Sequence, residues 1–390
     1  MFDTSVIELS RGALKRNFRF MRRRLGPHPT ISCVIKGNAY GHGIESFLPM
    51  AEECGVGHFS VFSASEAVRA VASSCRDRTH VMVMGHIEGE AIPWAVEHGV
   101  SFYVFDLDRL EAARKAASRI GKPALVHLEV ETGLNRTGLG DGDLDRALEV
   151  LAENRDRLRL SGVCTHYAGA ESVNNYLRIQ EQKRRYDQAL ERVNAAGLEP
   201  GLRHTACSAA ALTYPETVMD MVRTGIAMYG FWPSEQTKMH YIRNCCQTPS
   251  QRRANPLRRV MRWKSSIMSL KEVEAGEFIG YGTSCLATRK RVLASVPVGY
   301  YHGFARSLSN LGYVLVHGRR ANVAGLVNMN ALLVDVTDMN GKVRKGDEVV
   351  LIGRQKRAHI SVSSFSDMTR NPNYEVLTRI PACIPRVVVD

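Results

Sequence analysis

The sequence predicts an α/β protein in which an N-terminal (β/α)8 barrel of the TIM type is followed by a mainly β C-terminal domain. Three observations support this fold class. At 390 residues the chain is too long for a single hydrophobic core. Short apolar β runs alternate with amphipathic helical stretches over roughly the first 230 residues. Beyond Trp263 the helical periodicity disappears and short β runs take over.

The alternating part begins with a helix that Ser10 can cap, since Leu14, Phe18, Met21 and Leu25 follow at helical spacing. Eight later segments are predicted to be strands: Ile31–Lys36, Phe59–Ser63, Val81–Gly85, Phe102–Phe105, Leu125–Glu131, Leu160–His166, a stretch near Leu202–Ser208, and Arg223–Tyr229. Amphipathic stretches between them are predicted to be helices: Ile44–Cys54, Ala64–Ser73, Leu107–Ile120 and Gln180–Ala196.

The second domain is inferred from five further β runs: Ser266–Leu270, Val292–Val298, Tyr313–His317, Leu332–Val336 and Val349–Ile352. The stretch Pro233–Pro256 is polar and basic and has a proline at each end, which is typical of a long connection. We therefore expect a barrel domain at 1–233, a connector at 234–257 and a β-rich domain at 258–390.

Composition excludes several classes of protein. A hydrophobic content of 44% and a charged content of 23% are typical of a soluble globular chain, and no apolar run reaches membrane-spanning length. The first residues lack the basic and apolar segments of a signal peptide, and the nine cysteines follow no disulfide or zinc pattern. We expect a cytoplasmic protein without a metal site.

The formal net charge of +13 raises the possibility of nucleic-acid binding. The basic clusters are dispersed, however, and no aromatic residues alternate with them to stack on bases. We interpret them as solvated surface and expect no nucleic-acid partner.

Lys36 is the residue with the clearest chemical implication. It ends a short apolar run and is followed by a glycine-rich turn that contains Tyr40 and His42. Strand ends at the mouth of a barrel carry active sites, and a lysine there can hold an aldehyde cofactor as a Schiff base. The competing interpretation is a solvated lysine that merely closes a strand.

Other segments supply what pyridoxal phosphate would need. Ser208 and the small-residue segment 224–226 are suited to binding a phosphate group. Arg223 stays charged and donates hydrogen bonds, so it could pair with an unprotonated pyridine nitrogen. That pairing weakens the electron sink and favours simple proton exchange over side reactions.

A series of motifs in fixed order then resembles the alanine racemase family, which consists of fold-type III pyridoxal-phosphate enzymes. The matching segments span almost the whole chain: Val34–Gly43, Glu131–Gly138, Thr165–Ala168, His204–Ala210, Arg223–Gly230, Gly280–Gly282, Val327–Asn330 and Tyr374–Glu375. The resemblance implies a barrel followed by a β domain, in agreement with the periodicity, and an amino-acid racemase that uses pyridoxal 5'-phosphate.

The resemblance also implies roles for individual residues. Lys36 would bind the cofactor and exchange the α-proton on one face, and Tyr281, from the β domain of the partner subunit, would be the base on the other face. His166 and Arg223 would connect that tyrosine to the pyridine ring. The phosphate would be held by Tyr40, Ser208, Gly225, Ile226 and Tyr374. Arg136 would orient Tyr281, and the Met329 backbone would contact the substrate carboxylate. A site shared in this way implies a homodimer.

The chain departs from the family pattern at several positions. Glu129 stands where many members have a lysine that is sometimes carbamylated, so the pair Glu129–Arg136 is a plausible built-in replacement. Leu326, Asn328 and Asn330 also differ from the common residues. These departures leave open a racemase of serine, or of a larger amino acid such as lysine or ornithine, beside one of alanine.

Two other classes of protein fit the sequence less well. A decarboxylase on the same architecture is disfavoured by Tyr281 and by Arg223, because a carboxylate partner for the pyridine nitrogen would strengthen the electron sink. A non-catalytic pyridoxal-phosphate carrier would not need the second domain, on which the chain spends about 130 residues.

Overall fold

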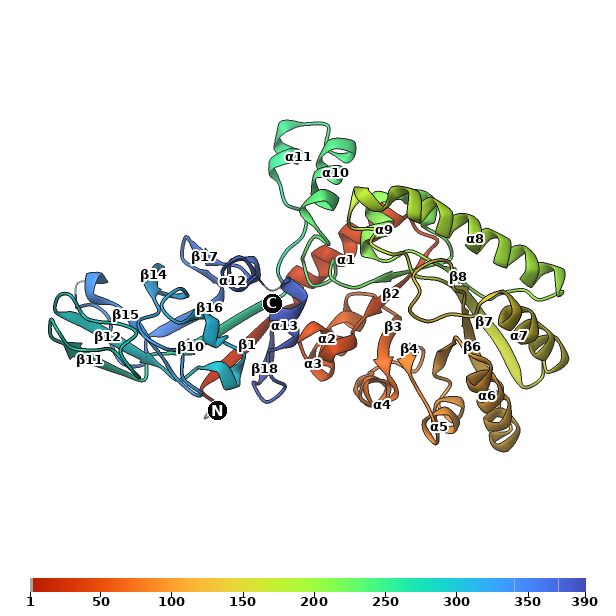
Figure 1. Cartoon of the computed structure of the whole chain (residues 1–390), viewed down its shortest axis with the longest axis horizontal. Helices are drawn as coiled ribbons and strands as arrows, with labels where there is room; N and C mark the ends of the chain where they lie inside the picture. Colours follow the sequence, from red (N-terminus) through yellow and green to blue (C-terminus); the bar gives the residue numbers. More distant parts are fainter. Residues whose placement is uncertain (1–2, 340, 371) are drawn as a thin grey trace. The chain divides into compact units, whose positions relative to one another are not determined.

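A computed structural model describes residues 3–339, 341–370 and 372–390 of the chain (Figure 1). The contacts within the chain define two units. The barrel unit contains Gly12–Gly37 and Leu48–Arg258. The β unit contains Met1–Arg11, Asn38–Phe47 and Arg259–Asp390.

Within the described residues, the barrel unit has one sheet of eight parallel strands: β2 (Thr30–Val34), β3 (His58–Ser63), β4 (His80–His86), β5 (Ser101–Val104), β6 (Ala124–Glu129), β7 (Leu158–Cys164), β8 (Arg203–His204) and β9 (Met221–Thr224). Neighbouring strands pair in chain order from β2 to β8, and β9 pairs with β2. The Asp220 amide donates to the Arg203 carbonyl at 3.1 Å, and the Arg223 amide donates to the Ala206 carbonyl at 3.0 Å. These bonds connect β9 to β8, so the sheet forms a nearly closed barrel and the predicted fold class is confirmed.

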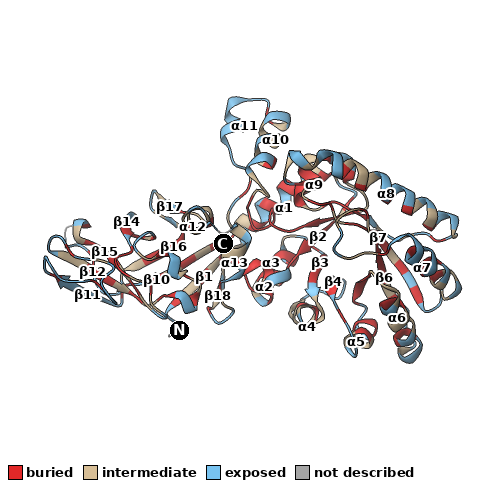
Figure 2. Cartoon of the chain, in the orientation of Figure 1, coloured by how far each residue is buried: buried red, intermediate tan, exposed pale blue. Residues whose placement is uncertain are grey.

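Helices follow most of the strands: α1 (Arg11–Leu25), α3 (Ile44–Glu53), α4 (Ala64–Ser73), α5 (Ala91–Glu97), α6 (Leu107–Ile120), α7 (Asp141–Glu153), α8 (Tyr176–Ala195) and α9 (Ser208–Thr213). Helices α4 to α8 lie outside the strands (Figure 1). Helix α6 illustrates why they form. The Asp106 side chain caps its first turn by accepting from the Arg109 amide at 2.7 Å, and Gly121 ends it with a φ of 73°. Its buried residues Leu110, Ala113 and Ala117 recur at helical spacing, and Figure 2 shows such buried faces on the barrel helices.

Six of the predicted barrel strands extend too far toward their carboxyl ends, and three of them carry site residues whose setting changes as a result. Strand β2 ends at Val34, so Lys36 opens the short element α2 (Lys36–Tyr40) instead of closing a strand. The run near Leu202–Ser208 is a strand only at Arg203–His204, and Ser208 begins α9. The third run ends at Thr224 because turns follow it. An apolar run does not by itself distinguish a buried strand from the buried turn that follows it.

Residues 234–257 contain two helices that the sequence analysis did not expect, α10 (Glu235–Cys245) and α11 (Pro249–Arg253). The Ser234 hydroxyl caps α10 by accepting from the Thr237 amide at 3.0 Å. Thr248 caps α11 in a capping box with Gln251. The cap residues therefore give these polar sequences a defined local structure.

The β unit contains ten strands among the described residues: β1 (Ser5–Ser10), β10 (Met261–Ser266), β11 (Ser269–Val273), β12 (Arg291–Val296), β13 (Tyr313–Val316), β14 (Arg319–Asn322), β15 (Leu332–Asp335), β16 (Glu348–Gln355), β17 (Ala358–Ile360) and β18 (Arg386–Val389). The larger sheet has the order β14-β13-β16-β10-β1-β18, with β17 beside β16, and the smaller has the order β11-β12-β15. Helices α12 (Val362–Thr369) and α13 (Asn373–Thr378) accompany them.

Two features of the β unit differ from the sequence analysis. The first strand of the chain, β1, was not predicted, and it pairs with β10 and β18 in the C-terminal sheet. Its residues alternate between buried and partly exposed, with Ile7 and Leu9 fully buried. The predicted strand Ser266–Leu270 is wrong, because β10 ends at Ser266 and β11 begins at Ser269. Over the ranges described above, no helix is both long and apolar enough to cross a membrane.

Candidate active site

Lys36 lies two residues after the carboxyl end of β2, at the start of a turn with left-handed backbone angles. The Ile35 amide still donates to the Ser60 carbonyl of β3 at 2.8 Å. The four residues after Lys36 then have positive φ angles, between 50° and 63°, which makes α2 a left-handed turn. Three of the four are not glycine, and each costs about 1–2 kcal/mol in this conformation. Backbone strain of this kind is concentrated at functional sites, where the surrounding structure enforces it.

The amine of Lys36 lies in an electrostatic environment that favours its neutral form. The side chain is exposed, yet the protein atoms around it displace much of the water that would stabilise an ammonium ion. This loss of hydration lowers the pKa of Lys36, and the cations Arg136 and Arg223 lower it further. Glu66 opposes the shift. A lysine with a lowered pKa is a better nucleophile and a better base near neutral pH.

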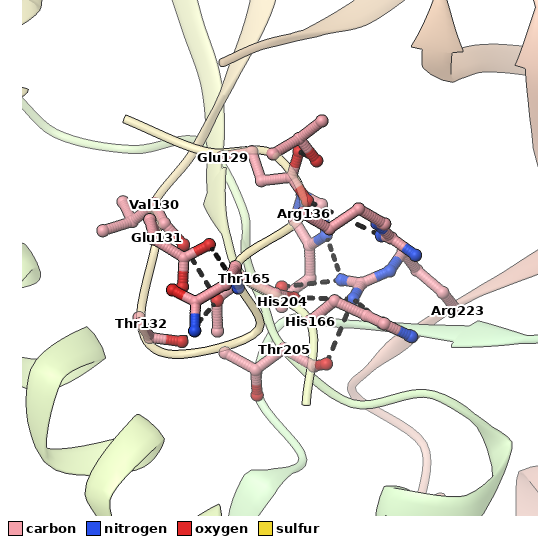
Figure 3. Close-up of polar contacts among 12 residues, drawn as sticks. Glu129, Val130, Glu131, Thr132, Arg136, Thr165, His166, His204, Thr205 and Arg223 are labelled. Atoms are coloured by element: carbon pink, nitrogen blue, oxygen red, sulfur yellow. Dashed lines mark hydrogen bonds and ion pairs between the residues drawn. The ribbon is translucent and has the colours of Figure 1, made fainter. Parts of the chain in front are cut away.

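Arg223, on β9, is buried and is held by a set of hydrogen bonds that uses both terminal nitrogens (Figure 3). Nη1 donates to Nδ1 and to the carbonyl oxygen of His204, each at 2.7 Å. Nη2 donates to the carbonyls of Thr165 at 2.8 Å and Thr205 at 3.1 Å, and to Nδ1 of His166 at 3.4 Å. The guanidinium therefore has one orientation, fixed from two segments of the barrel end, 165–166 and 204–205.

His166 follows β7 and is half-buried beside this guanidinium. Burial lowers the pKa of His166 to about 3, and the cations Arg223 and Arg136 contribute to the shift. The imidazole is therefore neutral at pH 7, and its Nδ1 accepts the proton of Arg223. The structure brings His166 and Arg223 together as the sequence analysis expected.

Two histidines that the sequence analysis did not select continue the chain from Arg223 into the barrel. Arginine can only donate, so Nδ1 of His204 must accept from it and the proton of this neutral ring lies on Nε2. Nε2 of His204 therefore donates to Nδ1 of His127 at 2.9 Å. Both rings are buried. His204 lies within a motif that the sequence analysis quoted, whereas His127 has no signal in the sequence beyond its place in a buried strand.

Glu129 and Arg136 approach each other at the end of β6. The two charged groups are 3.9 Å apart, between Oε1 of Glu129 and Nη2 of Arg136. The glutamate side chain is 4% exposed and the arginine side chain is 59% exposed. Burial raises the pKa of Glu129, while a 2.8 Å hydrogen bond from Thr137 and the charge of Arg136 oppose the rise. The two groups are thus close enough to attract each other, and the exchange of function between them and a carbamylated lysine stays a prediction.

The loop that carries Arg136 is stabilised locally. The carboxylate of Glu131 accepts from the amide of Gly133 and from the amide of Asn135 at 2.9 Å. Asn135 has a φ of 58°, a conformation that asparagine tolerates better than most residues. Figure 3 shows Glu131 and Arg136 on this loop and Glu129 at the end of the strand that precedes it. These hydrogen bonds from the loop amides fix the loop conformation and therefore the position of the Arg136 backbone.

Two of the segments expected to bind phosphate lie together in the barrel unit. The Gly225 amide donates to the hydroxyl of Ser208, the first residue of α9, at 3.0 Å. Ile226, the next residue, is buried. The hydroxyl of Thr224 donates to the Ser32 carbonyl of β2 at 3.3 Å, which fixes the start of this segment against the barrel.

Tyr40 and Tyr374 lie together in the β unit, with their ring centroids 6.0 Å apart. Close packing of the turn after Lys36 against α13 accounts for this arrangement. A Cβ atom on Gly41 would overlap the Leu377 carbonyl oxygen, so only glycine fits at this position. Arg386 also donates to the Gly41 carbonyl at 2.8 Å.

Tyr281 lies on a tight turn of the β unit, between Gly280 and Gly282, whose φ angles are 76° and 68°. Its side chain is 71% exposed. Gly280 lies against Leu326, whose segment continues to the exposed residue Met329. The turn therefore lies beside the segment in which the chain departs from the family pattern. Among the residues that the structure describes, no group of three or more His, Cys, Asp or Glu could hold a metal ion.

Comparisons with known proteins agree with this architecture. The family description "Alanine racemase, N-terminal domain" matches residues 9–233, and "Alanine racemase, C-terminal domain" matches residues 260–388. A curated alanine racemase of Leptospira interrogans is 33% identical over 392 residues, which cover 100% of this chain and 97% of that protein.

Two solved structures are also similar. The alanine racemase of Streptomyces coelicolor A3(2) has a TM-score of 0.88 at 31% identity, covering 99% of this chain and 98% of that one. The alanine racemase of Bacillus anthracis with bound L-Ala-P has a TM-score of 0.88 at 27% identity, covering 100% and 96%.

Fold, site and comparisons together define an isomerase, an enzyme of the amino-acid racemase class. Within that class, the chain belongs to the alanine racemase family. The resemblance inferred from the ordered motifs is therefore confirmed. The serine, lysine and ornithine alternatives, the decarboxylase and the non-catalytic carrier gain no support from the comparisons.

Proposed function

We propose that the protein interconverts L- and D-alanine, with pyridoxal 5'-phosphate bound to Lys36 and with Lys36 and Tyr281 of the partner subunit as the two bases. The observation that carries the proposal is the position of Lys36. It follows a barrel strand, and loss of hydration together with Arg136 and Arg223 favours its neutral amine. The family supplies the choice of substrate, since the similar proteins are named as alanine racemases.

The residues present fit this cofactor. Ser208 and the backbone of Gly225 and Ile226 would bind its phosphate, together with Tyr40 and Tyr374. Arg223 would donate to its pyridine nitrogen, and the bonds to His204 and the two threonine carbonyls hold the guanidinium still for that role. When bound, the cofactor would supply an electron-withdrawing ring that makes the α-proton of the amino acid labile.

Racemisation requires a proton to leave one face of the α-carbon and another to arrive on the opposite face. Nζ of Lys36 would serve one face, and the hydroxyl of Tyr281 of the partner subunit would serve the other. A tyrosine hydroxyl is a weak acid and needs neighbouring donors. His166 and Arg223 would provide a hydrogen-bonded connection, Arg136 would orient the tyrosine, and the Met329 backbone would bind the substrate carboxylate.

A site built from Lys36 and Tyr281 of the partner subunit implies a homodimer. We further propose the domain limits inferred from the sequence, with the cofactor-binding barrel at 1–233, a connector at 234–257 and the base-contributing β domain at 258–390. D-Alanine biosynthesis in the cytoplasm is the role that suits this activity.

Solvent exchange tests the reaction itself. L-alanine incubated with the enzyme in D2O should lose its α-proton signal by NMR while D-alanine accumulates. Serine, lysine and ornithine in parallel tubes would measure specificity. Absence of α-deuteration for all four amino acids would contradict a racemase, and faster exchange with another amino acid would reassign the substrate.

The shared site is tested by mixing two inactive variants. Lys36→Ala and Tyr281→Phe proteins should each be strongly impaired alone. After subunit exchange, a hybrid dimer contains one site with both bases intact, so up to about a quarter of the wild-type activity should return, because a statistical mixture is half hybrid and each hybrid has one intact site of two. No recovery after exchange has been verified by mass spectrometry would exclude a site between subunits.

A further inference from the structure

A cavity lies at the opposite end of the barrel from Lys36. It has a volume of about 640 Å³ and is lined by residues at the amino ends of the barrel strands, including Thr30, His58, Ser101 and Arg159. Cavities that bind small molecules have volumes of about 300–1,000 Å³. The amino face of such barrels is ordinarily a place for stabilising contacts, so an open cavity there requires an explanation.

His127 is one of the residues that line this cavity. The ring is 1% exposed, and its Nδ1 accepts the proton of His204 Nε2. The proton of a neutral His127 must therefore lie on Nε2. Among the residues that the structure describes, Nε2 has no hydrogen-bond partner. The acceptor for this N–H group is therefore a molecule in the cavity, either water or a bound ligand.

A second buried histidine has a similar arrangement. His58 lines the same cavity, is 7% exposed, and places its Nδ1 2.9 Å from the Ser32 hydroxyl. Burial lowers the pKa of His58 and of His127 to about 3, so both rings are neutral at pH 7. The floor of the cavity therefore offers polar groups without any negative charge.

The charged residues that line the cavity indicate the charge of the ligand that it would bind. The described residues that line the cavity include the guanidinium groups of Arg22 and Arg159 and the imidazoles of His28 and His80, and they include no aspartate or glutamate. Arg22 already donates to three carbonyls of the loop before β2, whereas Arg159 is exposed at the start of β7. Guanidinium groups bind carboxylate and phosphate oxygens with good geometry.

We propose that this cavity binds a small oxyanion, a phosphate or a carboxylate, which accepts a hydrogen bond from His127 Nε2 and pairs with Arg159. The ligand is distinct from the pyridoxal phosphate at the carboxyl ends of the strands. The site depends on no step of the racemase reaction, so its test is independent of the proposed function.

Isothermal titration calorimetry tests the proposal on protein saturated with pyridoxal phosphate, so that the predicted cofactor site cannot bind the probe. Inorganic phosphate and malonate are titrated separately, which distinguishes a phosphate ligand from a carboxylate ligand. Wild-type protein should bind at least one of them. Arg159→Ala should weaken binding about tenfold or more, since it removes a charge-assisted hydrogen bond.

Two further variants complete the design. Gly57 lines the cavity, and a Cβ atom added there would have nothing within 4 Å, so Gly57→Phe should fill the space and abolish binding without disturbing the barrel. Arg146→Ala, an exposed arginine on α7 outside the cavity, should bind like wild type. No heat of binding for either anion up to about 10 mM, or equal binding by wild type and both cavity variants, would overturn the proposal.

Discussion

Gly162 provides the sharpest test of the barrel interior. It lies on β7, and a Cβ atom there would overlap Nδ1 of His127 and would lie 2.6 Å from the Leu202 carbonyl oxygen. That carbonyl already accepts from the Val163 amide at 2.9 Å, so the backbone cannot easily move away. Gly162→Ala must therefore displace the His127 ring and break its bond to His204.

These contacts set the loss of folding free energy that Gly162→Ala causes. Forcing an extra methyl group into a packed interior costs about 1–3 kcal/mol. Breaking the 2.9 Å bond between the two imidazoles leaves the buried Nε2–H of His204 without its acceptor, which adds about 1–3 kcal/mol. The sum of about 2–6 kcal/mol is a large share of the 5–15 kcal/mol that typically stabilises a folded protein.

Urea unfolding followed by circular dichroism measures this loss as a shift of the midpoint, which remains meaningful even if the two units unfold separately. Gly142→Ala is the matched control, because nothing lies within 4 Å of its Cβ position and α7 is helical there. Alanine should stabilise that helix by up to about 1 kcal/mol. If Gly162→Ala unfolds at the same midpoint as wild type, the interior is looser than the structure indicates and the reasoning is refuted.

The histidines of the barrel predict acid sensitivity. Burial lowers the pKa of His58 and of His127 from 6.5 to about 3, so each stabilises the fold above pH 6.5 and loses that contribution as the pH falls toward 3. At pH 5 each loses about 2 kcal/mol, and a urea midpoint that is equal at pH 7 and pH 5 would contradict this. Glu129→Gln should lower kcat/KM about tenfold, because a neutral amide orients Arg136 less firmly. The exposed control Glu149→Gln should not change the kinetics, and equal behaviour of the two variants would exclude a role for the Glu129 charge. Arg223→Lys should cost about 2–4 kcal/mol of stability, since the three N–H groups of one ammonium cannot serve the five acceptors that surround the two terminal nitrogens of the guanidinium. Arg203→Lys, in an exposed pair with Asp220, should cost less than about 1 kcal/mol, and equal losses in the two variants would argue against the network.

Elements with local signals could be predicted from the sequence. The bounds of α4 and α6 agree with the predicted helices because both signals are local: Ser63 and Asp106 cap their first turns, and Gly121 ends the second helix in a left-handed conformation. The barrel could be predicted because strand and helix patterns alternate along the chain through eight strands. Its order of strands required no further information once alternation was recognised.

Features that depend on distant contacts could not be predicted. Strand β1 pairs with strands more than 250 residues later in the chain, and its six residues resemble any short apolar run. The left-handed turn after Lys36 is enforced by packing at Gly41 and not by the propensities of Asn38, Ala39 and Tyr40. The ordered motifs identified Arg223 and His166, but the bond from His204 to His127 depends on the register of strands far apart in the sequence.

The series of hydrogen bonds inside the barrel gives its buried histidines defined tautomers. Arg223 can only donate, so it fixes the proton of His204 on Nε2, and that proton fixes the one on His127. Each hydrogen bond therefore fixes the donor and acceptor of the next one, and both imidazole rings stay neutral. An acceptor bound beneath His127 stabilises the same tautomers that hold Arg223 in place, whereas a donor there would oppose them. The series of hydrogen bonds thus extends from Arg223 at the carboxyl ends of the strands to His127, which lines the cavity at the other end.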